Sequence, residues 1–217
     1  MNSLLKLIND MTETNCHDSD EDLLLRMAGG DEESFVTLYR RRQASVYRFA
    51  FQMSGSSTVA EDVTQEVFMA LIKDSSGFSA SKGKLAGYIY GIARNHVLRR
   101  LEKDRNTVSI DGGIDDELAS SSRVVEKSDP LSILARNETV ENVRNAVLAL
   151  PVHYREVVIL CELNEMSYVE TAAALNCAVG TVRSRLHRAR AILVEKLGAQ
   201  TDPKLSSNSA NSERCFA

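Results

Sequence analysis

Apolar residues return every three or four positions along most of this chain, which is the spacing of one face of an α-helix. No segment alternates apolar and polar residues in the way that a half-buried strand does. The longest stripe runs through residues 31–54 and consists of Phe35, Leu38, Tyr39, Val46 and Phe49. Similar stripes follow in residues 58–73 and 84–105. The pattern predicts an all-α protein.

Residues that favour helix caps mark the start of several of these segments. Ser19, which precedes three acidic residues, predicts the start of a first helix, and Asp31 predicts the start of a second. Thr58 and Glu61 have the spacing of a capping box and predict the start of a third. A loop rich in serine and glycine, residues 74–83, then leads to a fourth helix.

A change in composition divides the chain into two small helical domains. The expected segments are an N-terminal extension, a first domain, a flexible linker, a second domain and a disordered tail, at residues 1–18, 19–106, 107–129, 130–198 and 199–217. The linker is acidic and holds few large apolar residues, so it cannot bury enough surface to fold alone. It is either a solubilising spacer or an acidic strand that occupies a basic channel on a partner.

The second domain contains a helix-turn-helix at residues 167–190. Ser167 and Glu170 form a capping box at the start of its first helix. Asn176 stands at the turn, where a left-handed residue is needed and asparagine tolerates that conformation. In the second helix, one stripe is expected to be buried and consists of Val182, Leu186, Ala189 and Leu193.

The opposite face of that second helix is basic and polar. It carries Thr181, Arg183, Ser184, Arg185, His187, Arg188 and Arg190, with no acidic residue before Glu195. A merely solvated helix normally mixes charges of both signs. Arginine suits guanine edges and phosphates, and serine suits either, so this helix is predicted to lie in the major groove of DNA.

The first domain has one basic and one acidic surface. The helix at residues 84–105 carries six basic residues against two acidic ones, with Tyr88 and Tyr90 near its start and Phe78 in the preceding loop. Basic residues among aromatics suit unstacked bases, although the tyrosines could equally be core and the arginines solvated. The helix at residues 58–73 is expected to expose Glu61, Asp62 and Glu66, with Gln65 between them. That surface fits a basic protein partner, or it is an ordinary solvated face.

Overall charge and cysteine usage exclude several classes. The net charge is −4 and the pI is about 5.7, so any DNA-binding surface must be local. The four cysteines have no CxxC spacing, which argues against a disulfide framework and a metal site. No cofactor, signal peptide or membrane span is expected, and the compartment indicated is the cytoplasm. No nucleophile–base pair or phosphate-binding glycine loop appears, so an enzyme is not expected.

Four strings together closely resemble the extracytoplasmic-function (ECF, group IV) sigma factors of the sigma-70 family of bacterial RNA polymerase. They are AEDVTQEVFMALIK, GYIYGIARNHVLRRL, LPVHYREVVILCELNEMSYVETAAALN and VGTVRSRLHRARAIL. The resemblance implies that Asp62, Gln65 and Glu66 contact the β′ clamp helices of core polymerase. It implies minus-ten recognition by Phe78, Lys84, Tyr88, Asn95, Arg99 and Arg100.

The same resemblance implies that the helix-turn-helix reads the minus-thirty-five element. Ser184, His187 and Arg188 match base-reading positions, and Arg183 and Arg185 match backbone or base contacts. Two departures from the family pattern matter. Tyr88 lies at a position where family members often have tryptophan, and His187 lies at a base-reading position that varies within the family. The acidic linker resembles the segment that threads polymerase towards its RNA exit path.

The implied function is that of a sigma factor, which binds core polymerase through the clamp helices and the β flap, directs it to promoters and helps open the DNA. Control by an anti-sigma factor is expected. The alternative is a helix-turn-helix regulator that acts without replacing sigma. It predicts tight operator binding without polymerase, and it leaves the acidic helix unexplained.

Overall fold

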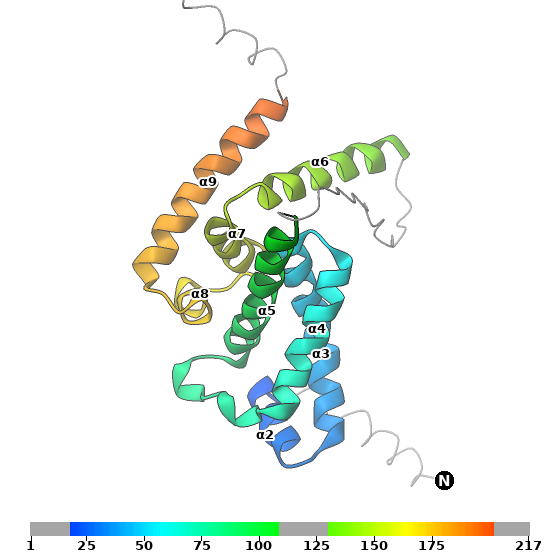
Figure 1. Ribbon diagram of the computed structural model, residues 1–217, viewed down its shortest axis with the longest axis vertical. Coiled ribbons are helices and arrows are strands. Elements are labelled where there is room, and N and C mark those ends of the chain that lie inside the picture. Colours follow the sequence, from blue (N-terminus) through cyan, green and yellow to red (C-terminus); the bar gives the residue numbers. More distant parts are fainter. Residues whose placement is uncertain (1–17, 109–129, 202–217) are drawn as a thin grey trace, which may run out of the picture. The chain divides into compact units, whose positions relative to one another are not determined.

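The computed structural model describes residues 18–108 and 130–201. All elements in these two ranges are helices, which confirms the all-α prediction. They form two compact units, one built on α2 to α5 and the other on α6, α7, η3 and α9 (Figure 1). Most of the expected linker and tail lies outside the described residues, as does the expected N-terminal extension up to residue 17.

The first unit consists of α2 (Asp20–Ala28), α3 (Glu32–Ser54), α4 (Ser57–Lys73) and α5 (Leu85–Val108). Two short 3-10 turns, η1 (Ser75–Gly77) and η2 (Ala80–Lys82), lie within the loop between α4 and α5. Helix α3 packs along α4, α5 packs against both, and α2 packs mainly on α3 (Figure 1). The sequence placed all four helices, while α5 extends three residues beyond its expected end at residue 105.

The apolar stripes of these helices meet in one core. Its fully buried members include Leu38, Val46 and Phe49 of α3 and Val63 and Val67 of α4. From α5 the core takes Leu85, Ile89, Ala93 and Val97, and from α2 it takes Leu23 and Leu24. Two aromatic residues of the α3 stripe, Phe35 and Tyr39, are only half-buried, because they face a groove at the surface.

Of the three helix caps predicted in this unit, two agree with the structure and one does not. Ser19 and Asp22 form a capping box at α2, and Asp31 caps α3 by accepting from the Glu33 N–H at 3.0 Å. The Thr58–Glu61 box is wrong, because Ser56 caps α4 by accepting from the Val59 N–H at 3.3 Å. Gly55 has a left-handed φ of 77°, which ends α3 and brings Ser56 at once into the extended capping conformation.

The second unit contains α6 (Pro130–Leu148), α7 (Val152–Val158), the π-helix η3 (Ile159–Leu163) and α9 (Val179–Thr201). Helix α9 packs on α7 and α6. Val182, Leu186 and Ala189 of the predicted stripe are buried against this core, and Leu193 is half-buried. Asn164 ends η3, as the sequence predicted for that helix, but the change to π geometry before it was not predicted.

The turn before α9 has the predicted chemistry. At α8 (Tyr168–Leu175), the Glu170 N–H donates to the Ser167 hydroxyl at 3.2 Å, and the Ser167 N–H donates to the Glu170 carboxylate at 2.9 Å. Asn176 has a φ of 50°, as expected for the left-handed residue between α8 and α9. The capping box and the asparagine turn are therefore confirmed.

Candidate nucleic-acid and protein interfaces

The basic face of α9 points away from the core of its unit. Arg183, Ser184, His187, Arg188 and Arg190 are exposed, whereas Thr181 and Arg185 are half-buried. This distribution follows from the helical period, since the buried residues Val182, Leu186 and Ala189 occupy the opposite side. A continuous polar and basic strip along one helix face is the geometry that a major groove can accept.

Two arginines of this face form ion pairs with carboxylates of α7 and η3. Arg185 lies 3.2 Å from the carboxylate of Glu156, a residue that is only 1% exposed. Arg190 lies 2.5 Å from the carboxylate of Glu162 in η3. The pattern within α9 does not predict these pairs, because the acidic partners lie 29 and 28 residues earlier in the chain.

The remaining basic residues differ in how firmly they are held. The Arg183 guanidinium lies 5.9 Å from the centre of the Tyr168 ring, in a cation–π contact that restricts its motion. Ser184 donates to the Thr181 carbonyl at 3.0 Å. His187 and Arg188 are exposed on the same face. Together Ser184, His187 and Arg188 present a hydroxyl, an imidazole and a guanidinium to a ligand.

In the first unit, an ion-pair cluster joins α4 to α5. The Arg100 guanidinium lies 3.0 Å from Asp62 and 2.9 Å from Glu66, and the second oxygen of Glu66 lies 2.6 Å from His96 Nδ1. Burial acts to raise the pKa of Glu66, but the Arg100 hydrogen bond and the charges of His96 and Arg100 hold it below its usual value. The sequence had assigned Asp62 and Glu66 to one partner and Arg100 to another, and the structure brings them together.

The aromatic residues of α5 and of the loop before it have different surroundings. Tyr90 is buried against Phe49, with ring centres 5.3 Å apart, so it belongs to the core. Tyr88 and Phe78 are half-buried, and their ring centres are 5.8 Å apart. Burial, with the nearby charge of Asp74, raises the pKa of the Tyr88 hydroxyl. Lys84, just before α5, is exposed, as are Asn95 and Arg99 further along the helix.

The hydroxyl of Tyr88 also explains a glycine in this loop. A Cβ atom at Gly77 would come within 2.4 Å of that hydroxyl, so Gly77 permits the close approach of the loop to Tyr88. The pair Phe78 and Tyr88 is therefore positioned by the loop backbone. The sequence predicted the aromatics but not this contact.

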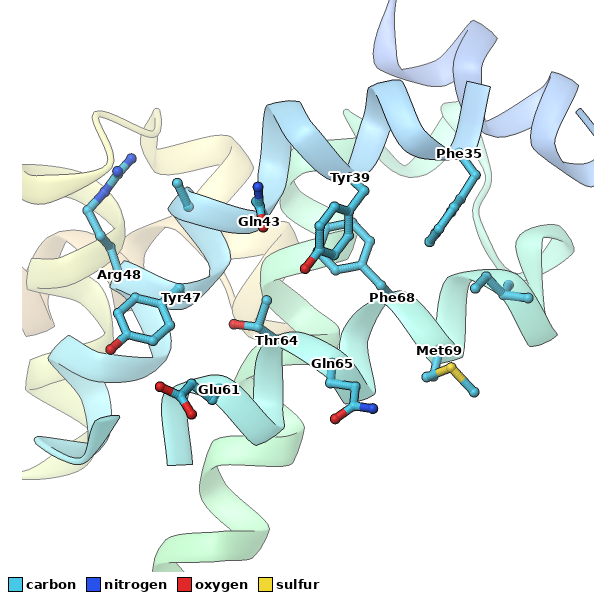
Figure 2. Close-up of a pocket in the computed structure, with 12 residues that line it drawn as sticks. Phe35, Tyr39, Gln43, Tyr47, Arg48, Glu61, Thr64, Gln65, Phe68 and Met69 are labelled. Carbon is cyan, nitrogen blue, oxygen red and sulfur yellow. The ribbon is translucent and has the colours of Figure 1, made fainter. Parts of the chain in front are cut away.

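A groove of about 720 Å³ lies between α3 and α4 (Figure 2). Helix α3 contributes Phe35, Tyr39 and Tyr47, and α4 contributes Phe68, Met69 and Ile72. Glu61 and Gln65 also line the groove. Met69 and Ile72 are 45% and 52% exposed, which is unusual for large apolar side chains on a packed helix. Sequence reasoning missed this groove because its aromatics share the period of the buried stripe.

Among the described residues, no cluster of histidine, cysteine or acidic side chains could hold a metal ion. Cys161 and Cys177 are free thiols, and Cys161 lies 3.3 Å from the hydroxyl of the buried Thr171. Over the same part of the chain, none of the helices combines the length and the apolar character that crossing a membrane requires.

The comparisons with known proteins define the class first. The profile of sigma-70 region 2 matches residues 38–107, and the profile of sigma-70 region 4 matches residues 141–193. These matches cover the first unit from Leu38 of α3 onward and most of the second. Both basic surfaces and the acidic face of α4 lie inside them. The chain is therefore a sigma factor of RNA polymerase.

Individual relatives narrow the class to one family. The ECF sigma-E factor of Escherichia coli strain K12 is 30% identical over 185 residues, which cover 82% of this chain and 94% of the relative. The ECF sigma factor SigW of Bacillus subtilis strain 168 is 28% identical over 171 residues, which cover 77% of this chain and 91% of the relative. The chain belongs to the ECF family of RNA polymerase sigma factors.

Solved structures of similar chains agree with this placement. The sigma factor RpoE of Bartonella quintana, in complex with the anti-sigma factor NepR, aligns with a TM-score of 0.58 at 26% identity, covering 72% of this chain and 91% of that chain. CnrH, in complex with the cytosolic domain of CnrY, aligns with a TM-score of 0.61 at 25% identity, covering 84% and 99%.

Proposed function

We propose that this sigma factor binds core RNA polymerase through α4 and the groove beside it, and reads promoter DNA through α9 and α5. The observation that carries the proposal is the separation of the surfaces by charge. An acidic and apolar surface lies on the first unit, and a basic strip runs along α9. Core polymerase would hold both DNA-reading surfaces on one promoter, which a chain of net charge −4 binds weakly alone.

For the minus-thirty-five element, Ser184, His187 and Arg188 are the proposed base-reading residues. Arg183, held over Tyr168, is suited to a phosphate contact, because a restrained cation loses less freedom on binding. Arg185 and Arg190 have carboxylate partners within the unit, so we assign them chiefly to orienting α9. Thr181, at the start of the strip, completes this surface.

For the minus-ten element, Phe78 and Tyr88 supply aromatic faces that could stack on a base displaced from the duplex. Lys84, Asn95 and Arg99 are exposed and supply charge and hydrogen bonds beside them. Capture of an unstacked base would offset the cost of opening the duplex, a few kcal/mol per base. No covalent chemistry is part of this proposal.

The proposed contact with polymerase consists of Asp62, Gln65 and Glu66 on α4 together with the apolar groove between α3 and α4. An apolar patch ringed by polar side chains is typical of a protein interface. The β′ clamp helices are the expected occupant, with the β flap as the partner of the second unit. The complexes of RpoE with NepR and of CnrH with CnrY support an anti-sigma factor as a further partner of this chain.

The first experiment is reconstitution. The purified protein, mixed with sigma-free core polymerase, is expected to form a stable complex and to start transcription from a specific subset of promoters. If no complex forms while the protein alone binds duplex DNA tightly and sequence-specifically, the chain acts as a regulator and the proposal is wrong.

A matched pair of substitutions tests the groove. Met69→Lys places a charge in the groove and is expected to weaken core binding about tenfold or more, which corresponds to about 1.4 kcal/mol. Leu25→Lys makes the same chemical change at an exposed apolar residue of α2 outside the groove, and it is expected to leave core affinity within about twofold. Affinity is measured by fluorescence anisotropy with labelled sigma factor. Equal effects of the two changes would remove the groove from the interface.

A further inference from the structure

In the cluster between α4 and α5, Arg100, a candidate for promoter binding, forms ion pairs with Asp62 and Glu66, two candidates for polymerase binding. Arg100 donates through Nη1 to Asp62 and through Nη2 to Glu66, and these carboxylates lie one helical turn apart on α4. Glu66 uses its other oxygen for His96. Both terminal nitrogens of Arg100 are therefore engaged inside the protein.

While Arg100 is paired with Asp62 and Glu66, the net charge of the cluster disfavours binding of a DNA phosphate. Two carboxylates face one guanidinium, so Asp62, Glu66 and Arg100 together carry a net charge of −1. A phosphate that approaches Arg100 meets this net negative charge in place of a free cation. If a basic partner neutralises the carboxylates, the same site becomes positive.

The cluster is open enough for a partner to compete for it. The side chains of Asp62, Glu66, Arg100 and His96 are 44%, 38%, 35% and 22% exposed. Ion pairs at such exposure are worth little individually, typically about 0.2–1 kcal/mol, so an arginine or lysine of a partner can exchange with Arg100 at small cost. A fully buried cluster would not allow this exchange.

We propose that Asp62 and Glu66 form an autoinhibitory clamp on Arg100, and that a basic polymerase surface which binds these carboxylates releases Arg100 for the promoter backbone. This inference rests on the proposed function, because it names how the two surfaces are coupled. The coupling is reciprocal: DNA bound to Arg100 frees the carboxylates and favours polymerase to the same degree. Asp62 and Glu66 thus act on DNA binding as positioning residues.

The clamp predicts that removal of both carboxylate charges improves DNA binding by the free protein. The probe is a fluorescein-labelled 20-nucleotide single-stranded DNA of random sequence, because a backbone contact is independent of sequence. The reference protein and every variant in this assay also carry Arg188→Ala, which weakens DNA binding by the basic strip of α9. The pair Asp62→Asn and Glu66→Gln is expected to bind about 3- to 10-fold tighter, a coupling at the low end of the usual range.

A double-mutant cycle separates release of Arg100 from a general change of charge. The gain is expected to vanish when Arg100→Gln is present as well. Glu102→Gln removes one negative charge, half the change of the double variant, at an exposed residue of α5, and any gain it causes is expected to persist in the Arg100→Gln background. A gain from Asp62→Asn and Glu66→Gln that also persists there would overturn the clamp, as would the absence of any gain.

Salt dependence supplies a second readout. One additional phosphate contact steepens the slope of log K against log salt by about 0.7 for single strands. The double variant is expected to show this increase and the variant with Arg100→Gln is not. If the double variant unfolds in thermal melts, Asp62→Asn alone is used. It frees only Nη1 of Arg100, so a smaller gain is expected, and this gain must also vanish with Arg100→Gln. Reconstitution with core polymerase is scored separately, so a failed sigma function and a failed clamp give different results.

Discussion

Arg185 and Arg188 lie three residues apart on α9, yet the structure gives them different surroundings. Arg185 is half-buried beside the carboxylate of Glu156, which is itself almost fully enclosed. Arg188 is exposed. The pattern along α9 placed both on one basic face and could not show that Arg185 is paired, because its partner is distant along the chain. Their roles are expected to separate into stability and DNA binding.

Substitution of each arginine by alanine tests this separation. Arg185→Ala removes an ion-pair partner of the buried Glu156 carboxylate. This change is expected to lower the free energy of unfolding by about 1–3 kcal/mol. Arg188→Ala is expected to change it by less than about 0.5 kcal/mol. For binding of the polymerase complex to promoter DNA, Arg188→Ala is expected to cost about 1–3 kcal/mol. Urea unfolding and promoter-binding titrations measure the two quantities. Similar stability losses for both variants would contradict the assignment.

At the scale of elements, local chemistry predicted most helix starts and turns. Ser19, Asp31 and the Ser167–Glu170 box cap the helices for which they were predicted. The start of α4 was misplaced by two residues, because several neighbouring residues have hydroxyl groups and only the left-handed Gly55 decides which one caps. The π-helix η3 and the groove between α3 and α4 were not predictable, since both depend on how packed helices meet rather than on local pattern.

The cap of α4 can be tested with two neighbouring residues. Ser56→Ala removes the hydroxyl that accepts from the Val59 N–H, and it is expected to lower the free energy of unfolding by about 1 kcal/mol. Thr58→Ala replaces an exposed residue inside the first turn, and a change within about 0.5 kcal/mol is expected. Thermal unfolding followed by circular dichroism distinguishes them. A larger loss for Thr58→Ala would restore the predicted capping box.

For the whole molecule, several carboxylates have pKa values below those of the free side chains. In Asp22 and Asp31 the main cause is a hydrogen bond from a serine hydroxyl, Ser19 or Ser34, and in Glu66 the Arg100 and His96 contacts outweigh burial. A carboxylate with a lowered pKa in the folded state stabilises the fold above its unfolded pKa. That contribution is lost as the pH falls through the folded value.

The first unit is therefore expected to lose stability as the pH falls below about 4.5, the ordinary value for Glu66, and further below 3.8, the value for the aspartates. Asp31→Asn keeps a capping oxygen but cannot titrate, so its stability is expected to depend less on pH. Hydrogen exchange of α2 to α5, corrected for intrinsic rates, measures the change. An identical pH dependence in Asp31→Asn would show that Asp31 does not contribute.

The groove between α3 and α4 has a consequence for chemical intervention (Figure 2). Its volume of about 720 Å³ falls within the range that drug-sized compounds occupy, and its walls combine aromatic rings with a few polar groups. A small molecule that fills the space between Tyr39, Phe68 and Met69 would compete with a protein partner for the same apolar surface. If the groove is the polymerase contact proposed above, such a compound is expected to weaken binding of this sigma factor to core polymerase by acting on the sigma factor rather than on the polymerase.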